Sequence, residues 1–270
     1  MKMKYKCVLT IAGSDPSGGA GIQADLKTFS ACGCYGASAI VAVVDENTVG
    51  VSGVHPIPVA FVAGQIKSVL DDIGADAIKI GMLHSSDLIL AVKDILLQYN
   101  ISNIVLDPVM VATSGDKLLM DEAIDTLIQE LIPCVRVITP NIPEAEILLG
   151  KKITCQTDLP LVIKDLSFNK SVSVLLKAGH LVEDELIDIF YNAETDEIRQ
   201  LPSKRIHTKN THGTGCTLSS AIAAFLAQGL PLTEAVTEAK EYINNAIIAG
   251  AEYEIGKGHG PVHHFWNFWK

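Results

Sequence analysis

A glycine-rich turn followed by an apolar helical segment is the stretch of this sequence best suited to chemistry. Residues 209–217 read KNTHGTGCT, so Gly213 and Gly215 stand among small hydroxyl residues. Two glycines so close together allow a tight turn whose N–H groups can approach a ligand. The apolar residues at 218, 221, 222, 225 and 226 predict an amphipathic helix. A glycine turn at a helix N-terminus predicts a site for an anion such as phosphate.

Cys216 lies at the N-terminus of that predicted helix. The positive end of the helix dipole favours the ionised thiol, so we expect Cys216 to be ionised more easily than a thiol in water. A loop that binds anions beside an ionisable group is typical of a site for phosphoryl transfer. A glycine loop that only begins a core helix explains the same residues, because short glycine motifs are unspecific. Another interpretation pairs Cys216 with His212 as a thiol hydrolase, although a glycine turn separates the two residues.

Several polar or glycine positions directly follow apolar runs that have the character of buried strands. They are Gly13, Met82, Asp107, Asn141 with Glu144, and Lys177. Ligands of open α/β sheets bind beyond the carboxyl ends of the strands, so we expect these positions to meet at one edge. Asp107 and Glu144 offer the carboxylates that Mg²⁺ prefers, and Lys177 at the end of a buried strand requires an anionic partner. The alternative for Asn141 and Glu144 is helix capping, and for Asp107 it is a turn that accepts backbone N–H groups.

Strand-like and helix-like runs alternate along nearly the whole chain. We expect strands at 6–12, 37–44, 77–82, 103–110, 135–139 and 173–177, helices at 22–31, 59–72, 87–98, 121–131, 159–166 and 232–249, and a hairpin within 186–206. This alternation predicts an α/β fold with a mainly parallel sheet and helices on both faces. The chain has neither a G-x-G-x-x-G fingerprint nor a P-loop, and no internal repeat or linker, so we expect a single domain over residues 1–270.

The composition narrows the classes of function. The 270 residues carry a formal net charge of −10, which argues against a partner that is a nucleic acid or an anionic membrane. The sequence lacks both a membrane-spanning apolar run and a leader segment, so we expect a cytoplasmic protein. The six cysteines contain no C-x-x-C pair, which predicts reduced thiols without a zinc site. His263, His264 and the aromatic residues after them are interpreted as a packed tail.

Taken together, longer motifs resemble a known family. They lie at residues 13–25, 79–82, 107–110, 139–145, 177–180, 209–217 and 258–264, in order along nearly the whole chain. The chain is similar to the bacterial hydroxymethylpyrimidine/phosphomethylpyrimidine kinases of thiamine biosynthesis, which have the ribokinase-like fold, a three-layer α/β/α sandwich. The resemblance implies phosphorylation of 4-amino-5-hydroxymethyl-2-methylpyrimidine at its hydroxymethyl group and then of the monophosphate. It also implies ATP and Mg²⁺ as cofactors, and a homodimer.

The resemblance further implies a role for individual residues. Cys216 would replace the aspartate base of most ribokinase-like enzymes, with Gly213, Thr214 and Gly215 stabilising the transferred phosphoryl group. The residues implied to contact ATP are Asn141, Lys177, Lys209 and Thr211, and those implied to hold Mg²⁺, directly or through water, are Asp107 and Glu144. The residues implied to line the pyrimidine site are Gly13, Asp15, Ala20, Val43, Glu46 and Met82.

One position departs from the family pattern, which typically has glutamine where this chain has Glu46. A glutamine amide complements both the amino group and the ring nitrogen of an aminopyrimidine, whereas an ionised carboxylate only accepts hydrogen bonds. Glu46 therefore fits if the ring or the carboxyl carries a proton, or if a neighbour such as Asn47 takes over. Pyridoxal and pyridoxine kinases share the fold and this type of loop, so a vitamin B6 kinase is the alternative function. A ligand sensor without activity on the same scaffold is a third hypothesis.

Overall fold

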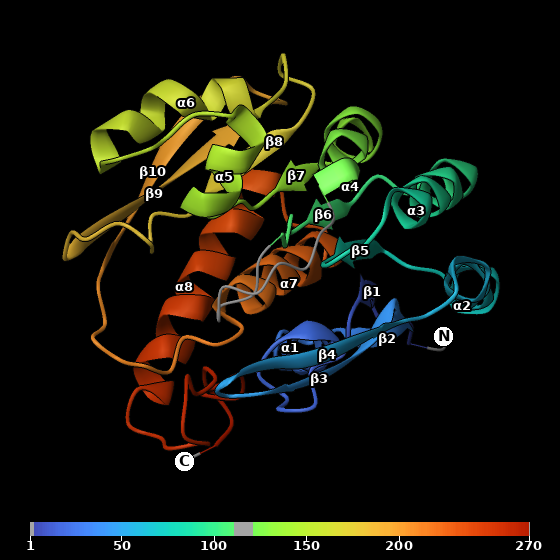
Figure 1. Ribbon diagram of the computed structural model, residues 1–270, viewed down its shortest axis with the longest axis horizontal. Coiled ribbons are helices and arrows are strands. Elements are labelled where there is room, and N and C mark those ends of the chain that lie inside the picture. Colours follow the sequence, from blue (N-terminus) through green and yellow to red (C-terminus); the bar gives the residue numbers. More distant parts are fainter. Residues whose placement is uncertain (1–2, 111–120, 270) are drawn as a thin grey trace.

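The computed structural model describes residues 3–110 and 121–269, and its centre is an eight-stranded sheet (Figure 1). The strands are β1 (Cys7–Ala12), β2 (Tyr35–Ile40), β5 (Ala77–Ile80), β6 (Ile104–Leu106), β7 (Val137–Ile138), β8 (Ser173–Leu176), β9 (Glu185–Asn192) and β10 (Glu197–Lys204). They lie in the order β10-β9-β8-β7-β6-β5-β1-β2. Pairing is parallel from β2 to β8, and β9 and β10 form the antiparallel hairpin that the sequence predicts. The expected mainly parallel sheet is confirmed.

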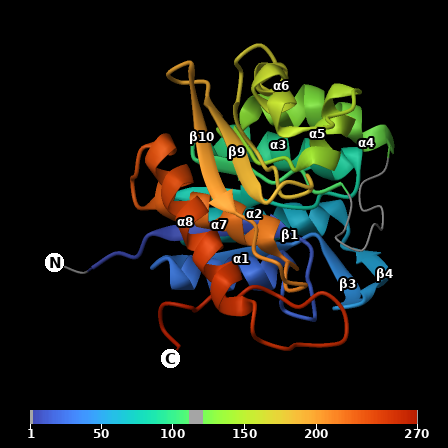
Figure 2. The same ribbon diagram turned by 90° about the vertical axis from the view of Figure 1, so that its left-hand side faces the viewer.

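Helices cover both faces of this sheet, which confirms the three-layer sandwich (Figures 1 and 2). One face packs against α1 (Gly21–Ala31), α7 (Thr214–Ala227) and α8 (Leu232–Gly250), and the other against α2 (Val59–Asp72), α3 (Ser86–Tyr99), α4 (Asp121–Thr126), α5 (Ile142–Leu149) and α6 (Leu159–Leu166). After α4 the chain continues through a π-helical turn, Leu127–Leu131, and a 3-10 turn, Ile132–Cys134. Successive strand residues alternate between the two cores, so that Val8 faces α7 and Leu9 faces the opposite layer.

Helix α7 is buried on nearly all sides, so the prediction of an amphipathic helix is wrong. It lies between the sheet and the helices α1 and α8, and of its residues from Thr217 to Ala227 only Phe225 is partly exposed. Alanines and serines at positions 219–221 and 223–224 allow neighbouring elements to approach closely. A helix surrounded by protein cannot have a polar outer face.

A two-stranded antiparallel sheet, β3 (Ala42–Asn47) with β4 (Gly50–Pro56), was not predicted. The expected single strand at 37–44 is two strands, because the chain leaves the main sheet after Ile40. The loop after β1 fixes β3, since Ser14 N–H donates to the Ala42 carbonyl oxygen and Val44 N–H to Ser14 Oγ at 3.1 Å. The hairpin therefore stands beside the carboxyl ends of β1 and β5.

The C-terminal segment packs against the glycine turn, as the interpretation of a packed tail requires. In Figure 2 it passes along the end of the molecule that carries α1. His212 N–H donates to the Gly260 carbonyl, and His264 Nε2 lies 3.1 Å from Thr217 Oγ1. Burial lowers the pKa of His264 to about 3, so this side chain is neutral. All six cysteines are free thiols, as predicted.

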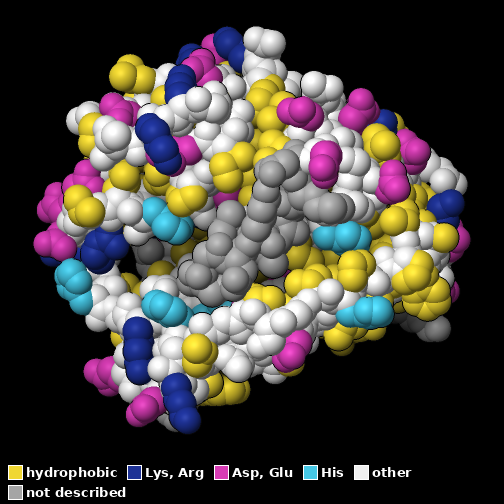
Figure 3. Space-filling view, viewed as in Figure 1, with side chains coloured by type: hydrophobic (Ala, Val, Ile, Leu, Met, Phe, Trp, Pro, Cys, Tyr) yellow, Lys and Arg dark blue, Asp and Glu magenta, His cyan; other side chains and the backbone are white. Residues whose placement is uncertain are grey.

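The part of the chain that the structure describes contains no helix with the length and apolar character needed to cross a bilayer. On the face seen in Figure 3, basic side chains are interspersed with acidic and hydrophobic ones.

Candidate active site

The glycine turn of residues 211–215, called here the anion loop, begins α7 and packs on a second loop. Gly213 is the N-cap of α7 with φ of 76°, a left-handed conformation that favours glycine. A Cβ atom at Gly213 would overlap the carbonyl oxygen of Gly19, in the loop that joins β1 to α1. Ala20 is the next neighbour of that position. The two glycine-rich segments are therefore in direct contact, and only glycine fits between them.

Asp15 holds this β1–α1 loop together. Its buried carboxylate accepts hydrogen bonds from the N–H groups of Ser17, Gly19 and Ala20 and lies 2.8 Å from His212 Nε2. Burial favours the protonated acid, yet the hydrogen bonds from His212 and from the loop hold the pKa of Asp15 well below its ordinary value. Asp15, expected to bind substrate, is thus occupied in joining the β1–α1 loop to the anion loop.

His212 does not act as the partner of Cys216 in this arrangement. Its Nε2 atom is bonded to Asp15, and among the described residues no hydrogen bond joins His212 to the Cys216 thiol. Nucleophilic cysteine hydrolases need an imidazole within hydrogen-bond reach of sulfur. The geometry therefore gives the thiol hydrolase interpretation no support.

The His212–Asp15 bond should make stability depend on pH. Burial opposes the imidazolium, but Asp15 raises the pKa of His212 above its ordinary value. The stabilisation is therefore complete below the unfolded pKa of about 6.5 and is lost as the pH rises through the folded pKa. Because the pKa of Asp15 is lowered, the same stabilisation also declines below the unfolded aspartate pKa of about 3.9.

We expect His212→Gln to reduce the free energy of unfolding by about 2 kcal/mol near pH 5.5, the value of a charge-assisted hydrogen bond. The loss should be smaller at pH 9, because deprotonation of His212 as the pH rises removes the charge from this hydrogen bond. Urea unfolding of both proteins at the two pH values measures this difference. His207→Gln is the matched control, since His207 forms an exposed pair with Asp184 at 3.4 Å. A loss that is equal at both pH values contradicts the prediction.

Cys216 occupies the first turn of α7, as predicted, but its ionisation does not follow the prediction. Burial raises the pKa of the thiol to about 11. The positive charge of Lys79 and the Gly21 N–H lower this pKa, whereas the negative charges of Asp25 and Asp107 raise it. Desolvation thus outweighs the helix N-terminus, and the thiol is neutral in the protein without ligands.

Asp107, Lys177 and the anion loop meet at the carboxyl edge of the sheet, as expected. Lys177 Nζ lies 3.0 Å from Asp107 Oδ1, which also accepts a hydrogen bond from Thr139 Oγ1 at 3.0 Å. A Cβ atom at Gly215 would be 3.2 Å from Lys177 Nζ, so this ammonium group lies directly against the loop. The prediction that Lys177 has an anionic partner is confirmed, and that partner is Asp107.

Asn141 and Glu144 form a capping box at the start of α5, which confirms the capping interpretation. The Asn141 side chain accepts from the Glu144 N–H at 2.9 Å, and Glu144 Oε2 accepts from the Asn141 N–H at 2.8 Å. Glu144 is buried, and burial raises its pKa to about 8; the charge of Lys177 lowers this pKa and that of Asp107 raises it again. Two buried carboxylates that repel each other suit a hard divalent cation, so this donor set fits Mg²⁺.

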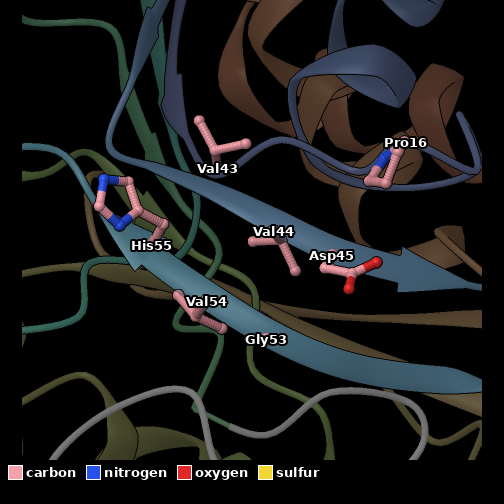
Figure 4. A pocket seen from close by; sticks show the side chains of 7 residues that line it. All are labelled: Pro16, Val43, Val44, Asp45, Gly53, Val54 and His55. Atoms are coloured by element: carbon pink, nitrogen blue, oxygen red, sulfur yellow. The ribbon is translucent and has the colours of Figure 1, made fainter.

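The residues expected to bind the pyrimidine separate into two groups. A Cβ atom at Gly13 would be 3.0 Å from Met82 Cε and 3.6 Å from Val44 Cγ2, so these residues form one wall. On β3, Val44 and Glu46 share the buried side, and Glu46 Oε1 lies 3.9 Å from His212 Nε2. Val43 points to the opposite side, as Figure 4 shows, and is 51% exposed. The assignment of Val43 to this wall is wrong because strand residues alternate, and Val44 takes its place.

Val43 also lines a hollow of about 480 Å³ beside the hairpin (Figure 4). Its other lining residues are Pro16, Val44, Asp45, Gly53, Val54 and His55, so the hollow lies on β3 and β4, and neither Asp107 nor Lys177 lines it. Two residues expected to contact ATP have no side-chain role that the structure reveals. Lys209 is exposed, and Thr211 contributes the carbonyl oxygen that accepts from Thr214 N–H.

Several polar residues of this region were not predicted from the sequence as part of the site. Thr139 follows β7, Ser219 Oγ lies 3.4 Å from Asp107 Oδ2, and Asp25 is fully buried on α1. A signal for Asp25 exists, since it falls on the helix face that carries Ile22 and Phe29. The hydroxyl residues carry no comparable signal, because buried serine and threonine are common in helices and strands.

Comparisons with known proteins show which family the chain resembles. The family model described as phosphomethylpyrimidine kinase matches residues 15–263. The hydroxymethylpyrimidine/phosphomethylpyrimidine kinase of Rhizobium meliloti is 48% identical over 97% of this chain and 98% of its own length. The solved phosphomethylpyrimidine kinase of Clostridium difficile is 44% identical, with a TM-score of 0.77 over 89% of this chain and 99% of that one.

A pyridoxal kinase from Staphylococcus aureus, solved with AMP-PCP and pyridoxal, has a TM-score of 0.88 at 35% identity over 98% of this chain and 96% of that one. The fold is thus shared with solved structures named phosphomethylpyrimidine kinase and pyridoxal kinase. The chain belongs to the phosphomethylpyrimidine kinase family.

Proposed function

We propose that this protein is an ATP-dependent kinase that phosphorylates 4-amino-5-hydroxymethyl-2-methylpyrimidine and then its monophosphate, in thiamine biosynthesis. The observation that carries the proposal is the contact of the anion loop with the Asp107–Lys177 pair, with Cys216 in the first turn behind it. The relatives with the highest identities quoted above are pyrimidine kinases, at 48% and 44%, against 35% for the pyridoxal kinase. Those values favour the pyrimidine over a vitamin B6 substrate.

The residues of the site would have different roles in phosphoryl transfer. N–H groups at the start of α7, from Gly213 to Cys216, would bind the oxygens of the transferred phosphoryl group. Lys177, held by Asp107 at 3.0 Å, would neutralise charge on the ATP phosphates, with Asn141 beside it. Asp107 and Glu144 would hold Mg²⁺, which supplies further neutralisation of phosphate charge when bound. Cys216 would accept the proton of the substrate hydroxyl, and Gly13, Val44 and Met82 would enclose the ring.

The function is tested by incubating the protein with ATP, Mg²⁺ and the hydroxymethylpyrimidine. We expect ADP and a pyrimidine monophosphate, followed by the diphosphate, all measured by mass spectrometry. Pyridoxal and pyridoxine in parallel reactions test the alternative, and a higher kcat/KM for either of them would replace the proposed substrate. Binding of the pyrimidine and ATP without turnover of any of the three would favour the ligand sensor.

Glu46 is expected to make substrate binding depend on pH. An ionised carboxylate complements an aminopyrimidine only when the ring nitrogen carries a proton. In wild type, KM for the pyrimidine should therefore rise with pH, whereas Glu46→Gln should have a KM nearly independent of pH. At pH 8 we expect the variant's KM to be about tenfold lower, equivalent to ~1.4 kcal/mol of hydrogen bonding. Asp45→Asn, on the opposite side of β3, is the matched control. Parallel pH profiles for wild type and Glu46→Gln refute this role.

We further propose that the protein acts as a single-domain homodimer in the cytoplasm. A single sheet whose strands span residues 7–204, packed against the late helix α8, supports one domain. The exposed apolar side chains of Val43 and Val54 on the hairpin and of Phe61 on α2 support self-association through this region. Analytical ultracentrifugation of the wild type and of Val54→Lys tests the dimer. We expect the charged variant to have a higher dissociation constant for dimerisation.

A further inference from the structure

A fully buried ion pair joins β5 to α1. Lys79 Nζ lies 2.9 Å from Asp25 Oδ1 and 3.0 Å from Asp25 Oδ2, and neither side chain is exposed. Removing two charges from water is costly, and an apolar pair of similar volume is often equally stable or more stable. Stability alone therefore does not account for these two residues, and the contacts of Asp25 point to another role.

Asp25 also reaches the helix that carries Cys216. Ser220 Oγ donates to Asp25 Oδ1 at 2.7 Å, and Thr10 Oγ1 donates to Asp25 Oδ2 at 2.5 Å. Ser220 lies one turn after Cys216 on α7, and Asp25 lies one turn after Gly21 on α1.

The Ser220–Asp25 hydrogen bond therefore joins α7, one turn after Cys216, to α1, and Lys79 extends this connection to β5. Gly21, at the start of α1, lowers the pKa of the Cys216 thiol. A shift of α7 along α1 would break the Ser220–Asp25 bond and move the sulfur.

We propose that Lys79, Asp25 and Ser220 are positioning residues that hold the sulfur of Cys216 at the substrate hydroxyl. The proposal rests on the proposed function, in which this sulfur accepts the substrate proton. Lys79 fixes the Asp25 carboxylate from the sheet side, and Asp25 in turn fixes α7 through Ser220. The charge of Lys79 lowers the pKa of the thiol, whereas those of Asp25 and Asp107 raise it. Lys177 also interacts electrostatically with the thiol, so Lys79 is one of two cations that favour a proton-accepting sulfur.

The network of Lys79, Asp25 and Ser220 is tested with the variants Lys79→Met and Ser220→Ala. Ser173→Ala is the matched control, because Ser173 is an equally buried serine on β8. The first readout is the rate at which iodoacetamide alkylates Cys216 at pH 8, followed on the peptide that contains it. We expect Lys79→Met to slow alkylation about tenfold, the effect of a one-unit rise in thiol pKa. A site that is merely loosened would instead alkylate faster, because the thiol would become more accessible.

The second readout is steady-state kinetics. Both variants should lower kcat, Lys79→Met about tenfold and Ser220→Ala less, without a change in KM for ATP. Alkylation and kcat at wild-type values in a folded Lys79→Met would overturn the proposal, as would an equal loss of kcat in Ser173→Ala. If Lys79→Met fails to fold by circular dichroism, an unchanged kcat in Ser220→Ala overturns it. Inactive wild-type protein would refute the proposed function, whereas the alkylation rates would still decide the network.

Discussion

Cys216→Ala is expected to lower kcat by about 10²–10⁴-fold, the usual contribution of a general base. Alanine keeps the helix and the N–H groups of the anion loop but removes the only group in the first turn of α7 that is positioned to accept the hydroxyl proton. Binding of ATP, measured by calorimetry, should be unchanged, because the described contacts of Lys177 and Asp107 do not include the sulfur. Cys155→Ala is the control, since Cys155 is a free thiol far along the chain, before α6. Turnover close to wild type in Cys216→Ala would eliminate this residue as the base.

The pH dependence of turnover gives a second measure of the same role, in the Glu46→Gln variant, where KM is expected to be nearly independent of pH. With a free-protein thiol pKa of about 11, kcat/KM of this variant should rise about tenfold per pH unit through neutral pH and beyond pH 9. Cys216→Asp should abolish this slope, because an aspartate is ionised throughout that range. A slope that is identical in Cys216→Asp would assign the titration to another group.

Gly213→Ala is expected to reduce the free energy of unfolding by about 2–5 kcal/mol. A left-handed backbone costs about 1–2 kcal/mol for a residue with a side chain, and the overlap of the new methyl group with the Gly19 carbonyl adds about 1–3 kcal/mol of overpacking. The overlap would also push the β1–α1 loop away from the anion loop, so we expect a higher KM for ATP. Urea unfolding and steady-state kinetics measure the two effects.

Gly229 offers a matched control for the backbone contribution. Its φ is 94°, so Gly229→Ala carries the conformational cost, but no other heavy atom lies within 4 Å of the added Cβ. The excess loss in Gly213→Ala over Gly229→Ala isolates the contact between the two loops. Equal losses, with unchanged kinetics, would mean that the loops are not tightly packed in solution.

The sequence pattern was sufficient to predict the fold class and the edge of the sheet that carries the site. Alternating apolar strands and helices leave few arrangements other than a mainly parallel sheet between two helical layers, and the strand ends of such a sheet share one edge. Residues that follow strands of this sheet, such as Asp107 after β6 and Lys177 after β8, were therefore predictable neighbours. The capping box of Asn141 and Glu144 was equally predictable from the sequence, because it depends on residues only three positions apart.

The surroundings of each of these groups depend on contacts between distant parts of the folded chain. The bond between Asp15 and His212 joins residues 197 positions apart, and the hairpin that directs Val44 rather than Val43 to the site depends on where the chain leaves the main sheet. The ionisation of Cys216 was predicted wrongly because the helix N-terminus is a local feature, whereas desolvation depends on everything packed around the sulfur. Local periodicity can be read from neighbouring residues in the sequence. Burial and long-range contacts are properties of the folded chain.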